Sequence, residues 1–471
     1  MTSLSARALA ILLDGWRTGG VAYAALADRI RLLVLDGRVA PGTRLPAERE
    51  LAAQLHISRT TVTAAYAELR EAGFATSLRG SGSVARLPFR APAAPEPAQP
   101  GYLDFSKATM PALPAVVQAS QRAAERLPAF LHESGFDAFG LLELRQAIAD
   151  RYAQRGLPTD PDQVMVTVGA QSAISLIART IMARGDRALI ENPTYPHALD
   201  ALKTAGARIA PVPVTSDDGW DEAVLEQTIQ RTSPSLGYLM PDNHNPTGRT
   251  MPAEQRERVL ALAARHGTTL VADETMAELG FDGGQVVPFA VHGPAILVGS
   301  VGKTVWGGVR IGWIRADRTV IQRLARERFT GDLGTPILEQ LVVAELLRDY
   351  DAILDARRAQ LRDGHDRLLR LLHERLPDWE VRPIGGGLTT WVNLGAPVSS
   401  QLALAARNEG LVIAAGPRFG VDGAFERFLR IPFSYPAEEL ERGVDALARA
   451  WSAVGRHAVQ MPMGDLTPSV V

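Results

Sequence analysis

Apolar residues recur at helical spacing in the N-terminal part of this chain of 471 residues. The positions concerned are Val62, Ala65, Tyr66 and Leu69. Their separations of three, four and seven residues predict a helix that buries one stripe. Ser58 precedes this helix and is predicted to be its N-cap, because a serine hydroxyl can accept a hydrogen bond from a free N–H of the first turn. A shorter helix from Glu48 to Leu55 and a turn over residues 56–58 are predicted ahead of it.

The opposite face of the second helix is polar. It carries Arg59, Thr60, Thr61 and Thr63. Small hydroxyls and an arginine near the start of an exposed helix suit contacts to phosphates and base edges in the major groove of DNA, although a solvated helix face is the alternative. After Gly73 the run 74–84 alternates and turns as a two-stranded wing would, with Arg79, Gly80 and Ser81 at its tip.

A different pattern begins near residue 100. The apolar runs 164–168 and 270–273 predict buried strands, and residues 172–182 predict a helix, which indicates a larger α/β domain. Before it, residues 87–100 contain five prolines and no periodicity. This segment is predicted to be a semi-rigid linker with a reach on the order of 40 Å, at about 3.1 Å per residue. Residues 4–17 predict an additional amphipathic helix, and residues 457–471 a loose tail.

The distribution of charged residues also separates the N-terminal part from the rest of the chain. Residues 1–90 contain twelve arginines, no lysine and seven acidic residues, whereas the whole chain has a net charge of −2. Nucleic acid would therefore be attracted to one end only. The absence of cysteine excludes disulfides, thiolate catalysis and cysteine-ligated metal sites. No apolar run approaches the length of a membrane span, and residues 8–13 are too short for a signal peptide, so we expect a cytoplasmic protein.

Lys303 is one of three lysines in a chain that otherwise uses arginine for positive charge. It lies in the Ser/Gly-rich segment 300–310, which indicates a need for a primary amine at this position. A lysine in a dry pocket can lose its proton and form a Schiff base, which a guanidinium cannot do. An ordinary solvated lysine is the alternative.

Two further segments suit a ligand site. Gly169, Ala170 and Gln171 form a predicted turn between a strand and a helix, where free N–H groups suit a phosphate. Asp273 ends the apolar strand 270–273, and ligands of open α/β sheets bind outside the carboxyl ends of the strands.

Taken in order, these segments resemble the pyridoxal 5'-phosphate (PLP) enzymes of the aspartate aminotransferase fold. The resemblance also includes Glu191-Asn-Pro-Thr-Tyr195, Asn245-Pro-Thr-Gly248 and Phe428-Leu-Arg430. It implies an α/β protein whose large fold-type I domain has a mixed, mostly parallel sheet. Six motifs in one order make this prediction far more specific than any one of them.

The resemblance implies a role for each site residue. Lys303 would carry PLP as an internal aldimine, and Tyr195 would stack on the pyridine ring. Asp273 would keep the ring nitrogen protonated, because an anion favours the charged form. Asn245 and Thr275 would contact the 3'-oxygen, and Arg430 would bind the carboxylate of an effector bidentately. The expected phosphate ligands are Gly169, Ala170, Gln171, Ser300 and Arg310.

The run from Leu45 to Gly73 resembles the winged helix-turn-helix of GntR-type regulators. The residues expected to contact DNA are Arg49, Ser58, Arg59, Thr60, Thr61, Thr63, Arg79, Gly80 and Ser81. A GntR-like head over 20–86, a linker over 87–100 and an aminotransferase-like body over 101–455 form the arrangement of MocR-type regulators. This resemblance implies a homodimeric transcription regulator that binds double-stranded operator DNA and senses an amine, an amino acid or PLP itself.

The sequence departs from the family pattern at two places. Thr275 stands where relatives carry a tyrosine shortly after Asp273, and the stretch 134–145 lacks the usual tyrosine. Both departures weaken support for full transamination without removing Schiff-base formation, so we expect a regulator in which half-reactions remain possible. An active aminotransferase with an accessory DNA-binding head is the rival hypothesis, and a purely structural PLP pocket is a third. Arg430 could equally pair with an internal Asp or Glu.

Overall fold

The structure is a computed structural model, and it describes residues 4–13, 16–17, 21–35, 39, 43–78, 82–85, 102–284, 286–421 and 423–455. The predicted wing tip at Arg79, Gly80 and Ser81 lies outside these ranges, as do the predicted linker over 87–100 and the predicted tail over 457–471. Among the described residues, no helix is long and apolar enough to cross a membrane.

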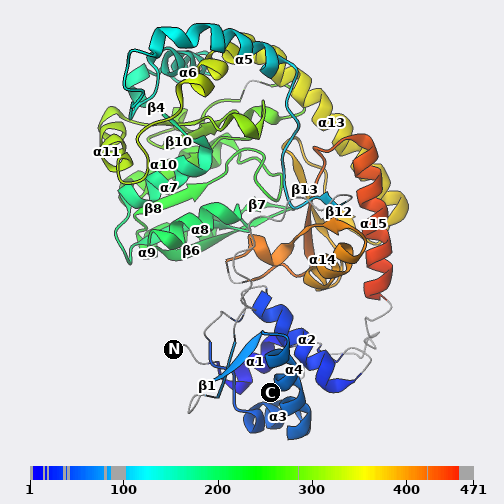
Figure 1. The fold of residues 1–471 in the computed structure, drawn as a ribbon. Coiled ribbons are helices and arrows are strands. Elements are labelled where there is room, and N and C mark those ends of the chain that lie inside the picture. The colour runs from blue at the N-terminus through cyan, green and yellow to red at the C-terminus, as the bar shows by residue number, and fades with distance from the viewer. Residues whose placement is uncertain are drawn as a thin grey trace.

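The N-terminal domain is a small bundle of helices followed by a β-hairpin (Figure 1). The elements are α1 (Ala6–Leu12), α2 (Ala22–Leu35), α3 (Glu48–Leu55), α4 (Arg59–Glu71), β1 (Ala75–Leu78) and β2 (Gly82–Ala85). Ser58 caps α4 as predicted, because its hydroxyl accepts a hydrogen bond from the N–H of Thr61 at 3.1 Å. All four residues of the predicted apolar stripe are buried.

The core of this domain extends beyond the helix-turn-helix. Leu9, Leu13 and Trp16 are buried in the same cluster as the stripe of α4, and α1 packs against α3. The helix predicted over residues 4–17 is therefore present as the shorter α1 and belongs to the domain. Strands β1 and β2 pair antiparallel, from Ala75 opposite Ala85 to Leu78 opposite Gly82, which confirms the two strands of the wing.

An eight-stranded sheet forms the centre of the large domain, in the order β4-β11-β10-β9-β8-β5-β6-β7. Strands β10, β9, β8, β5 and β6 are parallel to one another, whereas β11 pairs antiparallel with β10 and β4, and β7 pairs antiparallel with β6. The bounds are β4 (Val164–Thr167), β5 (Arg187–Asn192), β6 (Arg208–Thr215), β7 (Gly219–Trp220), β8 (Leu236–Leu239), β9 (Thr269–Asp273), β10 (Ile296–Ser300) and β11 (Gly312–Arg315). The predicted mixed, mostly parallel sheet is confirmed.

Helices cover this sheet, so strands such as β4 and β8 are buried at every position. The helices are α5 (Ala115–Arg126), α6 (Leu142–Gln154), α7 (Gly169–Ile181), α8 (Pro196–Thr204), α9 (Glu222–Thr232), α10 (Ala253–Arg265), α11 (Arg318–Arg328), α12 (Ile337–Leu346) and α13 (Tyr350–Arg375). Helix α7 begins at Gly169, three residues earlier than expected. The predicted Gly-Ala-Gln turn is thus the first turn of the helix.

A smaller C-terminal unit follows α13, which lies beside α15 (Figure 1). Its antiparallel sheet has the order β12-β13-β16-β15. The elements are β12 (Glu380–Val381), β13 (Thr389–Asn393), α14 (Ser399–Asn408), β14 (Leu411–Val412), β15 (Ala414–Ala415), the 3-10 helix η7 (Gly416–Phe419), β16 (Phe428–Pro432) and α15 (Ala437–Gly455). Strand β3 (Leu103–Asp104), at the start of the body, pairs with β14 and so joins this unit.

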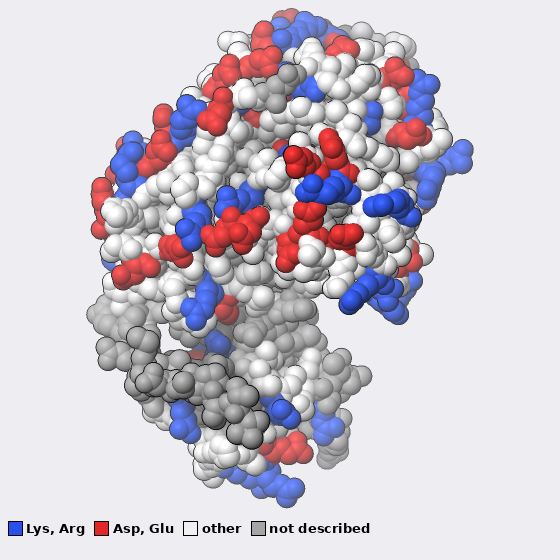
Figure 2. Space-filling model, turned by 180° about the vertical axis from the view of Figure 1, so that it is seen from behind, with Lys and Arg blue, Asp and Glu red and all other residues white. Residues whose placement is uncertain are grey.

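Acidic and basic side chains are intermixed over the body on the face seen from behind (Figure 2). Ion pairs between elements of the body include Arg318 with Asp160 and Arg151 with Asp351, the latter at 2.7 Å. That face of the body offers no single-sign field of the kind that attracts nucleic acid.

Candidate cofactor site and DNA-binding face

One cavity of about 420 Å³ gathers most of the predicted site residues at the carboxyl ends of the parallel strands. The predicted residues that line it are Ala170, Gln171, Tyr195, Asn245, Asp273, Thr275, Ser300, Lys303, Arg310 and Arg430. They come from segments spread over more than half of the chain. The open edge of the sheet therefore brings the motifs together, as the strand-end argument predicts.

Lys303 follows β10 and extends into this cavity. Its Nζ donates to the carbonyl oxygen of Ala108 at 2.5 Å. Burial, together with the nearby Arg430 and Arg310, lowers the pKa of the Lys303 amine to about 8, although Asp273 opposes the shift. An amine with such a pKa is partly neutral near pH 7, which is the form that attacks a carbonyl carbon.

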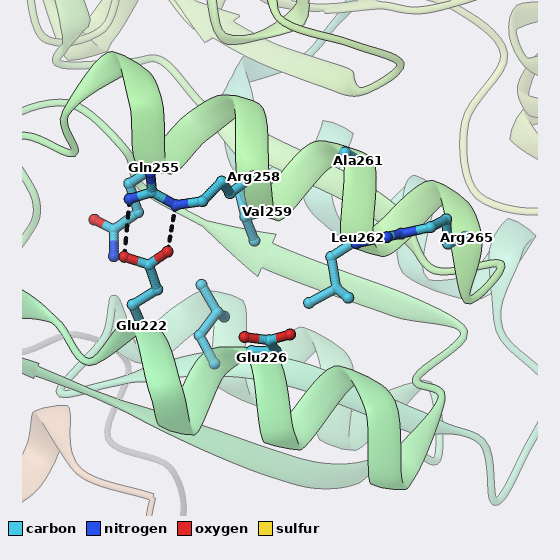
Figure 3. A pocket seen from close by; sticks show the side chains of 9 residues that line it. Glu222, Glu226, Gln255, Arg258, Val259, Ala261, Leu262 and Arg265 are labelled. Atoms are coloured by element: carbon cyan, nitrogen blue, oxygen red, sulfur yellow. Dashed lines mark hydrogen bonds and ion pairs between the residues drawn. The ribbon is translucent and has the colours of Figure 1, made fainter.

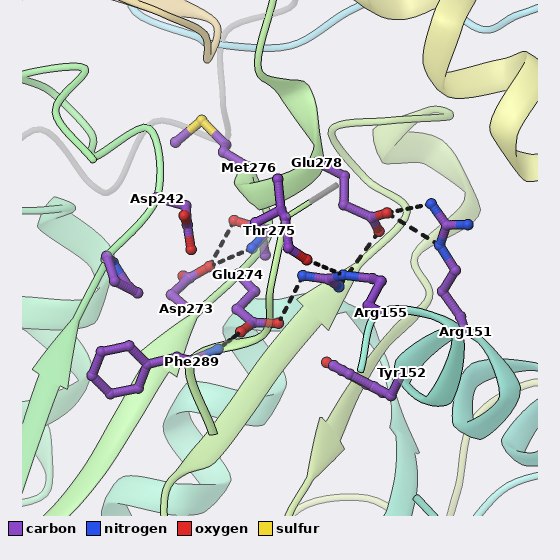
Figure 4. Close-up of polar contacts among 12 residues, drawn as sticks. Arg151, Tyr152, Arg155, Asp242, Asp273, Glu274, Thr275, Met276, Glu278 and Phe289 are labelled. Carbon is purple, nitrogen blue, oxygen red and sulfur yellow. Dashed lines mark hydrogen bonds and ion pairs between the residues drawn. The ribbon is translucent and has the colours of Figure 1, made fainter. Parts of the chain in front are cut away.

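Asp273 ends β9 and is buried beneath the cavity (Figure 4). One carboxylate oxygen accepts from the N–H and the hydroxyl of Thr275 at 3.0 and 2.7 Å, and the other accepts from the Tyr238 hydroxyl at 2.7 Å. Burial raises the pKa of the Asp273 carboxyl, and these hydrogen bonds only partly oppose the rise. A cationic ring nitrogen beside it would relieve the cost of burying this charge.

Thr275 lines the cavity, but its hydroxyl proton is used by Asp273. The sequence predicts a contact from Thr275 to the 3'-oxygen of the cofactor. In the structure this side chain orients the carboxylate instead. Tyr238, on the neighbouring strand β8, was missed by the sequence analysis because its position within an apolar strand gives no signal of a polar role.

The predicted phosphate end of the cavity is built from the start of α7 and the loop after β10. No side chain caps α7, so the N–H groups of its first turn are left for a ligand. Gly169 has a φ of +77°, and a Cβ there would lie 2.6 Å from Nη2 of Arg310. Glycine thus allows the guanidinium to lie against the helix terminus.

Ser300 and Gln171 are already engaged within the protein. The Ser300 hydroxyl donates to the carbonyl of Ile311 at 2.9 Å and accepts from the N–H of Gly302. The Gln171 amide donates to the carbonyl of His197 at 3.0 Å. Both side chains line the cavity, and their contact with a phosphate stays a prediction.

Arg430 lies on β16, and its guanidinium packs on the ring of Phe419 at 4.9 Å. It donates through Nη2 to the carbonyl of Ser106, while its Nε is buried without a partner. Burial lowers the pKa of Arg430 to about 10. None of the described acidic residues lies within ion-pair distance of it, so the alternative of an internal Asp or Glu partner fails within the described chain.

Asn245 is buried in the loop after β8, and its Oδ1 has no hydrogen-bond partner among the described residues. A buried pair holds this loop, because Nη2 of Arg256 lies 2.6 Å from Asp242. On the other side His244 lies 3.2 Å from Glu191, and both side chains are fully buried. These supporting residues have no counterpart in the sequence prediction, since each acts through a partner remote in the sequence.

Arg357 supports the lysine loop from α13. Its buried guanidinium donates to the carbonyls of Thr304 at 2.9 Å and of Pro111 at 2.6 Å, and it also bonds to Val305. The burial of this side chain lowers its pKa to about 10. Lys303 is therefore presented by a loop whose backbone is fixed by a distant helix.

A second buried network lies behind Asp273 (Figure 4). Arg155 lies 3.6 Å from both Glu274 and Glu278, and Arg151 pairs with Glu278. Burial raises the pKa of Glu274 to about 7, although Arg155 opposes the shift. This network ties α6 to the segment after β9 and so fixes the strand end that carries Asp273.

A separate groove of about 180 Å³ lies between α9 and α10 (Figure 3). Leu225, Val259 and Leu262 line it, and Arg258 pairs with Glu222 at one end. None of the predicted site residues contributes to it.

The predicted DNA-contacting side chains of α4 differ in whether they are bonded to other residues of the protein. Arg59 is 71% exposed and its Nε lies 3.9 Å from Glu48, and Thr60 is also exposed. Thr61 bonds to the Ser58 hydroxyl at 2.8 Å, and Thr63 donates to Glu48 at 2.7 Å. Arg49 of α3 is exposed as well. The contact of these residues with DNA stays a prediction.

Two family models match the chain. Residues 101–447 match aminotransferase class I and II, and residues 22–84 match the bacterial regulatory proteins of the gntR family. The chain belongs to the aminotransferase class I and II family. Its N-terminal domain is a GntR-type DNA-binding domain, and the two together form the MocR-type arrangement predicted from the sequence.

Known proteins similar to this MocR-type chain include both regulators and enzymes. The uncharacterized HTH-type transcriptional regulator YdcR of Escherichia coli (strain K12) is 28% identical over 460 residues, which cover 91% of this chain and 98% of YdcR. The 2-aminoadipate transaminase of Thermus thermophilus is 30% identical over 370 residues, 75% of this chain and 90% of that protein. The structure of LysN, an α-aminoadipate aminotransferase from the same organism complexed with N-(5'-phosphopyridoxyl)-L-leucine, matches with a TM-score of 0.69 and 27% identity, covering 76% of this chain and 94% of LysN.

The site of this MocR-type chain fits PLP. The uncapped start of α7 and Arg310 suit a phosphate, and the Asp273 carboxyl suits a protonated ring nitrogen. The partnerless Oδ1 of Asn245 shows that this side chain has hydrogen-bonding capacity left for a ligand. PLP supplies an aldehyde that captures amines and a ring that withdraws electrons.

The first prediction concerns the lysine. Lys303→Ala should abolish the absorbance of lysine-linked PLP near the violet edge of the visible spectrum and leave the far-ultraviolet circular dichroism unchanged, because it removes the amine without disturbing the loop backbone. Lys203→Ala, on the exposed side of α8, is the matched control and should keep the full absorbance. Borohydride reduction and peptide mapping that place the pyridoxyl group on another residue would refute the assignment.

The second prediction concerns α4. Arg59→Ala should weaken operator binding by about 1 to 3 kcal/mol if the guanidinium contacts a base, or weaken binding to all sequences alike if it contacts phosphate. Fluorescence anisotropy with operator and scrambled duplexes at several salt concentrations distinguishes the two. Arg449→Ala, which removes an equally charged and exposed side chain from α15, is the control. Unchanged affinity for both duplexes would remove Arg59 from the interface.

Proposed function

We propose that this chain is a transcription regulator that carries PLP at Lys303, senses an amine, an amino acid or PLP itself there, and transmits the state of that site to its DNA-binding head. One observation carries the proposal. The segment 102–111, called the strap below, follows the predicted linker in the sequence and is held by the two residues expected to bind cofactor and effector.

The strap is attached to the site at successive backbone carbonyls. Lys303 donates to the carbonyl of Ala108 at 2.5 Å, and Arg430 donates to that of Ser106. Ser106, Lys107, Ala108 and Thr109 line the cavity. Arg357 holds Pro111 at the far end, and β3 pairs with β14 at the near end. The middle of the strap is thus held by the functional side chains together with Ser434 and Tyr435, which donate to the carbonyls of Thr109 and Lys107 at 2.8 and 3.1 Å.

These bonds make the strap sensitive to the state of the site. Lys303 cannot donate an ammonium proton to Ala108 while it is bonded to the cofactor. A carboxylate bound to Arg430 would draw the guanidinium toward itself and weaken the hydrogen bond to Ser106. A hydrogen bond from a charged donor contributes about 1.5 to 3 kcal/mol. Coupling between two sites is typically about 1 to 3 kcal/mol, so the loss of one or two such bonds is sufficient to carry the signal.

The same proposal includes a homodimer. Two neighbouring segments expose large apolar side chains, Leu131, Phe136 and Leu142 in one and Phe329, Leu333 and Leu338 in the other. They are adjacent because the N–H of Leu141 donates to Gln340 at 2.7 Å and Arg328 donates to the carbonyl of Ala138 at 2.8 Å. Apolar patches of this kind are normally covered by a partner, and a second copy would also present two heads to paired half-sites.

A working aminotransferase is the second candidate, and the presence of Lys303, Asp273 and Arg430 in one cavity favours it. Similar proteins include a transaminase as well as a regulator. Steady-state conversion of amino acid and keto acid pairs separates the two, since turnover faster than about 1 per second lies within the ordinary enzyme range. Slower or absent turnover with ligand-dependent DNA binding identifies the regulator.

The third prediction tests the strap. In the PLP-loaded protein, an amino acid that changes the cofactor absorbance should change hydrogen–deuterium exchange in peptides covering 102–111, because it frees Lys303 and draws the guanidinium of Arg430. It should also change the affinity for promoter DNA about 5- to 150-fold. Arg430→Gln should speed exchange in the strap without any ligand, because it removes a donor to Ser106. Peptides covering β9 should be unaffected.

Control variants separate the possible outcomes. Arg427→Gln, in the same C-terminal unit but outside the cavity, should exchange like the wild type. Lys303→Ala should lose the ligand-dependent change in DNA affinity. If Lys303→Ala keeps that change, the site is only a structural pocket and the sensing mechanism is wrong.

The fourth prediction concerns the dimer. Sedimentation velocity at micromolar concentration should give the mass of two chains for the wild type. Phe136→Asp should shift the protein to a single chain, because it places a charge in the apolar patch, whereas Leu404→Asp on α14 should not. A monomeric wild type would contradict the proposal.

A further inference from the structure

The cavity contains more positive charge than the expected cofactor contacts require. Its lining includes the basic residues Lys107, Lys303, Arg310, Arg418 and Arg430, against the single acidic residue Asp273. Three of the five have expected partners: Arg310 would bind the phosphate, Lys303 the aldehyde and Arg430 an α-carboxylate. Lys107 and Arg418 are left over.

The ammonium group of Lys107 is paired within its own segment. Its Nζ lies 2.8 Å from Asp104, and the same carboxylate accepts hydrogen bonds from the N–H and hydroxyl of Ser106. These contacts form a closed local turn within the strap. A ligand carboxylate would have to break that turn to take the Lys107 charge.

Arg418 is held by a single carboxylate from another element. Its Nη2 lies 2.9 Å from Asp200 of α8, and both side chains are about half exposed, at 53% and 48%. His197 lies 3.9 Å from that carboxylate, and burial and the nearby Arg418 lower the pKa of its imidazole, which favours the neutral form. Water screens an exposed pair of this kind, so one carboxylate can replace another on Arg418 at little cost. A guanidinium also offers paired donors that match a carboxylate.

The backbone positions Arg418 without help from its own ion pair. The next residue, Phe419, packs its ring against Arg430 and accepts a hydrogen bond from the N–H of Thr194 at 2.9 Å. The N–H of Val421 donates to Asn192 at 3.0 Å. Arg418 therefore lies on the same wall of the cavity as Arg430, next to the segment that carries Tyr195.

We propose that Arg418 is a second carboxylate subsite, and that the effector is an α-amino acid whose side chain ends in an acidic group. Arg430 binds the α-carboxylate, and Arg418 exchanges Asp200 for the side-chain carboxylate. This inference rests on the proposed function, because it specifies the ligand of the same sensing site. It depends in addition on Arg418, which has no part in holding the cofactor.

The fifth prediction tests this subsite by absorbance titration of the PLP-loaded protein. The probes are L-aspartate, L-glutamate and L-2-aminoadipate, each compared with a neutral counterpart: L-asparagine, L-glutamine and L-norleucine. At least one acid should bind tenfold or more tightly than its counterpart. Arg418→Gln should reduce this preference to less than twofold while leaving the neutral affinity unchanged, and Asp200→Asn should tighten binding of the acid. Arg449→Gln, which also removes an exposed and paired arginine, should keep the wild-type preference.

The outcomes distinguish the subsite from the sensor. If the wild type shows no preference for an acid, or if the preference survives in Arg418→Gln, the subsite is wrong. The sensing function stands in that case when neutral amino acids still change both the absorbance and the DNA affinity. If no amino acid perturbs bound PLP, both the subsite and amino acid sensing fail.

Discussion

Charge buried at the carboxyl ends of β9 and β10 is the constraint on which this structure depends. Asp273 and Lys303 follow neighbouring parallel strands, and burial disfavours the charged form of each. Directed hydrogen bonds, rather than an ion pair between the two residues, hold these groups in place. Tyr238 and Thr275 hold the carboxylate, and a backbone carbonyl holds the amine. Such a site is stable enough to fold, and a ligand of complementary charge would stabilise it further.

The same solution explains how a cofactor site can communicate with a separate domain. Lys303 and Arg430 satisfy part of their hydrogen-bonding capacity on the carbonyls of the strap. A ligand that binds these groups competes with the polypeptide for them. Under the proposed function, the segment leading to the DNA-binding head is therefore in energetic competition with the ligand, which is a differential interaction of the kind that coupling requires.

The DNA-binding head is specified largely by local sequence. A stripe of four buried residues and one serine cap specify α4, and the polar positions that remain are exposed or bonded near the helix start. Thr63 shows the limit of this reasoning, because it lies on the polar face but donates its hydroxyl to Glu48 of α3. Helix periodicity says which side faces outward, whereas the partner of a hydroxyl depends on how two helices cross.

Local pattern therefore determined much of this protein. Spacing, capping and turn residues placed the helix-turn-helix, the strand that ends at Asp273 and the lysine loop, because each depends on residues close together in the sequence. The tertiary structure alone decided the contact of Tyr238 with Asp273, the support of the lysine loop by Arg357, the attachment of the strap and the place of Arg418 in the cavity wall. These contacts join residues as much as 324 positions apart. Their partners are fixed by the way strands and loops meet in space, and no local periodicity encodes that meeting.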